Sequence, residues 1–249
     1  MQNISQIDQL RVQAGANKFL IIAVLACMFL LLVGLRLAPE DSTPFTGKVL
    51  ALLGPTLVAG SAGAYFGRRI TGWLPIIGLF LLAMAGLFLV RAAGGGDLAL
   101  ILLLGWGFVF GMVLGPLVGS VLAEEGPQIV VQALVGTTGI MMISAFVALA
   151  TGINFSFLLP ILFLGLIGLI IVGLVGIFVR FSRTVNLTYS LMGIVIFSGL
   201  FLYDFYRVGK IGNTNNTWQA AIQMTTSLYL DFANLFIYIL RFLAASRRR

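Results

Sequence analysis

The sequence contains no histidine, a single cysteine (Cys27) and only eight acidic residues among 249. Without histidine, the chain lacks the commonest metal ligand and the usual switch near neutral pH. One cysteine excludes both an intramolecular disulfide and a cluster of thiolate metal ligands. Charged residues make up 9% of the chain, whereas a soluble domain carries roughly a quarter. These shortages argue against a water-soluble fold and against the common metal centres.

Apolar residues are abundant instead, at 60% of the chain, and only lipid can cover so much apolar surface. We expect an all-α polytopic transmembrane helical bundle of seven or eight spans, with eight preferred. A span needs about 20 apolar residues. The eight candidates are 18–37, 48–67, 73–91, 98–122, 129–151, 157–180, 187–208 and 217–243. Residues 1–17 form a polar tail, 18–243 a single transmembrane domain, and 244–249 a basic tail.

The net charge of +7 comes from Lys and Arg that lie between the apolar blocks and at the C-terminus. Basic residues in such places mark topology and contact anionic lipid headgroups, so we expect a bilayer and no nucleic acid as partner. With eight spans and the N-terminus inside, ten Lys or Arg residues fall inside and five outside. This count favours two cytoplasmic termini. The short loops favour a bacterial inner membrane.

The last span carries a row of polar side chains at the helical period, from Gln223 through Ser227, Asp231 and Asn234 to Tyr238. A charged residue facing lipid in mid-bilayer costs several kcal/mol on insertion scales. We therefore expect the last helix to be central in the bundle, with this polar stripe facing other helices or a water-filled path.

Asp204 and Asp231 are the only acids well inside predicted spans, and they lie on consecutive antiparallel helices. If they meet, they can share a proton, or separate and bind a cation, because two ionised carboxylates repel. They meet only if the last helix begins outside the hydrocarbon or the seventh continues beyond Asp204. Arg91 ends the third span on the same side and is a possible partner of Asp204. A structural role for each carboxylate, and headgroup contact for Arg91, remain the alternatives.

Small residues recur in the second span at Gly60, Ala64 and Gly67, and at Gly63 and Gly67, a spacing that permits close helix contact. Proline falls inside two spans. Pro116 lies mid-span, where it is either part of a gate or a structural bend.

Two stretches resemble the Bax inhibitor family, the transmembrane proteins that carry the Bax-inhibitor motif. These are FSGLFLYDFYRV (197–208) and TSLYLDFANLFIYILRFL (226–243), with a weaker likeness in GFVFGMVLGPLVGSV (107–121). The resemblance implies a helical bundle with a central last helix and a pH-sensitive calcium leak gated by two aspartates, which match Asp204 and Asp231. It also implies an arginine at the end of an early helix, matched here by Arg91. The preferred extra N-terminal span is similar to the mitochondrial branch.

From these residues we expect a calcium leak channel or Ca²⁺/H⁺ pathway, with Asp204 and Asp231 as gate, pH sensor and weak, transient Ca²⁺ ligands. One alternative is a non-conducting regulator of a membrane protease or of a stress or death pathway, which acts through helix–helix contacts. Another is a proton-coupled transporter of a small solute. No nucleophile–base pair and no metal-ligand spacing is visible, so we expect neither an enzyme nor a tightly bound cofactor.

Overall fold

The computed structural model describes residues 43–179 and 181–247. In that part of the chain every long element is a helix. The bounds are α2 (Phe45–Gly67), α3 (Trp73–Ala92), α4 (Asp97–Glu125), α5 (Pro127–Ala150), the short 3-10 helix η1 (Phe155–Phe157), α6 (Leu158–Phe178), α7 (Arg183–Gly212) and α8 (Trp218–Arg247). All seven long helices are long and apolar enough to cross a membrane. They match seven of the eight predicted spans. The remaining one, 18–37, which is the first along the chain, lies outside the described residues.

Local sequence signals set several helix boundaries. Gly126 alone separates α4 from α5; its φ of 82° is a conformation that residues with a side chain rarely adopt. Pro127 then occupies the first turn of α5, where its missing N–H is not needed. The side chain of Ser182 caps α7 by accepting a hydrogen bond from the backbone N–H of Val185.

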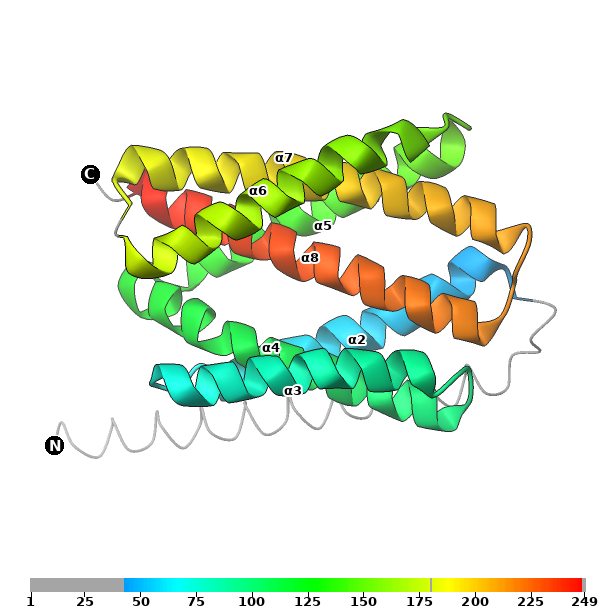
Figure 1. Cartoon of the computed structure of the whole chain (residues 1–249), viewed down its shortest axis with the longest axis horizontal. Helices are drawn as coiled ribbons and strands as arrows, with labels where there is room; N and C mark the ends of the chain where they lie inside the picture. Colours follow the sequence, from blue (N-terminus) through cyan, green and yellow to red (C-terminus); the bar gives the residue numbers. More distant parts are fainter. Residues whose placement is uncertain (1–42, 180, 248–249) are drawn as a thin grey trace, which may run out of the picture.

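The last helix lies at the centre of the bundle, as the polar stripe predicted. Figure 1 shows α8 between α2, α3 and α4 on one side and α5, α6 and α7 on the other. It contacts α2, α3, α4, α5 and α7. In its most apolar stretch 61% of residues are buried, against 11% in both α3 and α6. The outer helices α3 and α6 therefore present their apolar side chains to lipid.

Helices α2 and α4 approach each other closely and touch backbone to backbone. Glycines line the contact on both sides: Gly60, Gly63 and Gly67 on α2, and Gly107, Gly111 and Gly115 on α4. A methyl group on Gly111 would collide with the carbonyl group of Gly60, and one on Gly63 would collide with that of Phe108. The spacing of small residues seen in the sequence therefore serves tight packing.

A buried lysine, Lys48, connects the N-terminal end of α2 to the rest of the bundle. Lys48 has no exposed surface, and its Nζ donates a hydrogen bond of 2.8 Å to the backbone carbonyl of Asn216, in the connection between α7 and α8. The same ammonium group lies 5.4 Å from the ring centre of Trp218. Lys48 thus ties the start of α2 to the start of α8.

Gly111→Ala should lower the free energy of unfolding by about 1–3 kcal/mol, because the new methyl group meets backbone that cannot move aside without separating α2 from α4. Gly105 on the same helix has no atom within 4 Å of an added methyl group and provides the matched control. Gly105→Ala should be neutral or slightly stabilising, since alanine favours helix. Thermal unfolding of the purified protein in detergent compares the two. Equal effects would contradict the backbone contact.

Candidate functional site

The structure brings Asp204 and Asp231 together at the interface of α7 and α8. Helix α7 continues for eight residues beyond Asp204, to Gly212, and Asp231 lies thirteen residues after the start of α8 at Trp218. The two helices pack against each other, and the two carboxyl groups interact across the interface. The meeting therefore follows from the extension of the seventh helix, one of the two conditions expected from the sequence.

The two carboxylates have different surroundings. Asp204 is 6% exposed, and its Oδ1 lies 3.3 Å from Nη1 of Arg207, one turn further along α7. The Arg207 side chain is 40% exposed and also lies over the ring of Tyr203. Asp231 is 8% exposed, and its buried Oδ2 has no hydrogen-bond partner. A buried oxygen without a partner is costly, so Asp231 retains the capacity to take up a proton or a cation.

The cation beside Asp204 differs from the one expected. Arg91 lies in the last turn of α3 and is exposed. Helix α3 packs on α4 and α8, and the ion pair of Asp204 is formed with Arg207 instead. The sequence signal for Arg207 was its spacing of three residues from Asp204, which places both side chains on one face of a helix.

The polar stripe on α8 runs from an exposed position into the interior of the bundle. Gln223 is exposed near the start of the helix, Ser227 is half-buried, and Tyr238 is buried. Asn234 is half-buried and satisfies its amide by donating a 2.8 Å hydrogen bond to the carbonyl oxygen of Leu230. The stripe thus faces protein over its middle part.

A cavity of about 480 Å³ lies beside this stripe, between α6, α7 and α8. Its polar lining comprises Asp231, Asn234, Tyr189 and Tyr238, and the two tyrosine hydroxyls lie 3.1 Å apart. The remaining lining is apolar and comes largely from α6, which packs on α7. A water molecule takes about 30 Å³ of liquid volume, so the space beside Asp231 can hold several.

Within residues 43–179 and 181–247, no group of three or more His, Cys, Asp or Glu side chains is placed to hold a metal ion. Ca²⁺ takes six to eight oxygen ligands. The carboxyl pair supplies part of such a shell, and hydroxyl groups and water would have to complete it. This arrangement suits brief contact with a passing ion better than tight storage.

Asp231→Asn should fold, and at pH 8 its thermal stability should equal that of the wild type or exceed it by about 1 kcal/mol. The amide keeps the shape of the side chain, cannot ionise, and can donate a hydrogen bond to the carboxyl group of Asp204. Asp97→Asn, an exposed substitution of the same chemistry in the first turn of α4, is the control. Unfolding of Asp231→Asn under conditions where Asp97→Asn is intact would instead make Asp231 a structural anchor.

Comparison with known proteins covers nearly all of the described fold. The family described as "Inhibitor of apoptosis-promoting Bax1" matches residues 42–248. An uncharacterized membrane protein of Vibrio cholerae is 35% identical over 84% of this chain and 94% of its own length. An uncharacterized protein of Campylobacter jejuni is 31% identical, with 82% and 90% covered. Protein LIFEGUARD 3 of Arabidopsis thaliana is 31% identical over 56% of each chain. The chain therefore belongs to the Bax inhibitor family of integral membrane proteins, the family that its last two spans resemble.

Proposed function

We propose that this protein is a pH-sensitive leak pathway for Ca²⁺, with or without exchange of H⁺, and that the Asp204–Asp231 pair is its gate. One observation carries the proposal. The carboxylate of Asp231 is buried, keeps an oxygen without a hydrogen-bond partner, faces a second carboxylate and borders a cavity with further hydroxyl and amide groups. Membership of a family broadly linked to cell-death regulation is compatible with control of an ion store.

The gate works through repulsion between like charges. At low pH a proton shared by the two carboxyl groups would hold α7 against α8. At high pH both groups ionise. Two unit charges about 4 Å apart repel by roughly 4 kcal/mol at an effective dielectric constant of 20. A change of that size shifts a two-state equilibrium by roughly a thousandfold, so ionisation favours separated helices and an open, cation-attracting path.

Arg207 sets the balance of charge in the closed arrangement. Its guanidinium group compensates Asp204, while part of its side chain is exposed, five residues before α7 ends at Gly212. When Ca²⁺ takes the place of the guanidinium group beside Asp204, Arg207 can turn to water or headgroups. In this proposal Ca²⁺ replaces the guanidinium group beside Asp204, so the ion does not add its charge to a site that is already neutralised.

The proposed setting is a bacterial inner membrane with both termini in the cytoplasm. The start of α7 and the end of α8 lie at one end of the bundle, where Arg183 donates hydrogen bonds to the backbone carbonyls of Ala245 and Ser246. The same end carries Arg68 and Arg69 after α2. This basic end is the cytoplasmic one under the positive-inside rule, so Asp204 is reached from the outer end.

A non-conducting regulator of a membrane protease or of a stress pathway is the competing proposal. It would use the same buried carboxylates as structural contacts and the exposed apolar faces of α3 and α6 as surfaces for a partner helix. The two proposals differ in one measurable property, the passage of Ca²⁺ through the purified protein.

Purified protein in liposomes should pass Ca²⁺ several-fold faster at pH 8 than at pH 6. Asp231→Asn should remove most of this pH dependence, since a single remaining carboxylate has no like charge to repel. Asp97→Asn should behave as the wild type. Flux no greater than that of empty liposomes, from protein shown to be folded by circular dichroism and gel filtration, would overturn the leak pathway and leave the regulator.

A further inference from the structure

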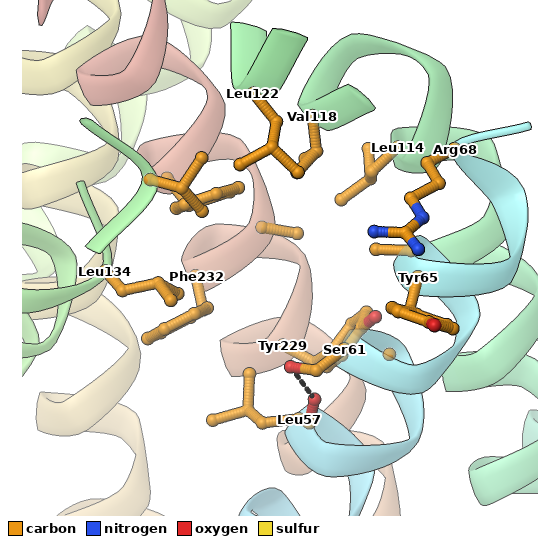
Figure 2. Close-up of a pocket in the computed structure, with 15 residues that line it drawn as sticks. Leu57, Ser61, Tyr65, Arg68, Leu114, Val118, Leu122, Leu134, Tyr229 and Phe232 are labelled. Atoms are coloured by element: carbon orange, nitrogen blue, oxygen red, sulfur yellow. Dashed lines mark hydrogen bonds between the residues drawn. The ribbon is translucent and has the colours of Figure 1, made fainter. Parts of the chain in front are cut away.

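A second pocket, of about 220 Å³, lies on the opposite face of α8 from Asp231 (Figure 2). Its floor is formed by Tyr229, Phe232 and Phe236 of α8, and its walls come from α2, α4 and α5. At 100° per residue Tyr229 and Phe236 lie about 140° or more around the helix from both Asp231 and Asn234, and Phe232 lies about 100° from Asp231. The pocket is therefore separate from the proposed ion site.

The interior of the pocket is apolar, because its polar side chains already have partners. The hydroxyl of Tyr229 donates a 3.0 Å hydrogen bond to the carbonyl oxygen of Gly107. The hydroxyl of Ser61 donates one of 2.9 Å to the carbonyl oxygen of Leu57, drawn as the dashed line in Figure 2. An apolar cavity of about 150 Å³ stays dry and takes up benzene. A hydrocarbon group therefore suits this pocket better than water.

One cation stands at the rim. Arg68 follows the last residue of α2, and its guanidinium carbon lies 4.0 Å from the ring centre of Tyr65. Figure 2 shows the guanidinium group turned toward the pocket, above Tyr65. Among the described residues, Arg68 engages this ring rather than a carboxylate. A positive charge thus lies next to an apolar chamber.

The depth of the pocket matches one leaflet of a bilayer. Leu57 lines its deep part and Arg68 its rim, and these residues are eleven positions apart on α2, which is about 16 Å along a helix. Half of the hydrocarbon core of a membrane is about 15 Å thick. If α2 spans the bilayer, Arg68 at its end would lie at the level of the headgroups and Leu57 near the middle of the bilayer.

We propose that this pocket binds one acyl chain of an anionic phospholipid whose phosphate contacts Arg68. Basic pockets between transmembrane helices bind anionic headgroups, and guanidinium geometry suits phosphate oxygens. The chain lies along Leu57, Leu114 and Phe232, in the space that α2, α4 and α5 leave over α8. The lipid bridges the tightly packed α2–α4 pair and α5, which do not otherwise close over α8 at this point.

The test compares two lipids with identical chains, phosphatidylglycerol and phosphatidylcholine, added to the full-length protein in detergent. Phosphatidylglycerol should raise the thermal midpoint by about 5 °C more than phosphatidylcholine does. Arg68→Gln should abolish the difference. Arg69→Gln should keep it, because Arg69 carries the same charge next to Arg68 but is exposed and does not line the pocket. Equal losses in both variants would indicate general attraction of lipid to a basic surface and overturn the proposal.

A pocket-filling variant tests the acyl chain separately. Ala64→Phe places a ring in the pocket while Arg68 remains, so it should remove the response to phosphatidylglycerol without lowering the midpoint of the lipid-free protein. Glycerol 3-phosphate, which offers the headgroup phosphate alone, should not stabilise the wild type. A full response in Ala64→Phe, or stabilisation by glycerol 3-phosphate equal to that by the lipid, would overturn the proposal.

Discussion

The bundle depends on one constraint: the polar side chains of α8 cannot face lipid. In hydrocarbon no water is present to satisfy them, so each must find a protein partner or a protected space. Helix α7 supplies Asp204 and its cation beside Asp231, and α4 supplies a backbone carbonyl to the hydroxyl of Tyr229. The least apolar span, α8, thus lies innermost, and the most apolar helix, α6, lies outside it together with α3.

The sequence predicted the features that depend on long apolar runs and on the regular spacing of polar or small residues. Apolar stretches of about 20 residues marked the seven described spans, and the period of the stripe that includes Asp231 placed α8 at the centre. The small residues of the second span, among them Gly60, Gly63 and Gly67, predicted a close helix contact, which the structure shows between α2 and α4. The meeting of Asp204 with Asp231 was predictable as a possibility, because consecutive helices are antiparallel, although their roles stay a prediction.

The remaining features depend on depth and on side-chain packing, which spacing within one span does not determine. Topology placed Arg91 on the same side as Asp204, but it gave neither the depth of Arg91 nor the direction in which its side chain points. The cavity next to Asp231 exists because α6 packs on α7. The sequence of α6 is evenly apolar, so it does not indicate which helix α6 packs against. The hydroxyl of Tyr229 on α8 donates its hydrogen bond to the backbone carbonyl of a glycine, Gly107, on α4.

The backbone contact between α2 and α4 makes one flank of the bundle more rigid than the other. Carbonyl groups pressed against glycine Cα atoms leave no side chain that can change rotamer, so this flank resists both compression and sliding. On the other flank, α6 packs on α7 through side chains and borders the cavity beside Asp231. Any expansion around Asp231 must therefore be taken up on the side of α6 and α7, with the α2–α4 pair acting as the fixed frame against which the other helices move.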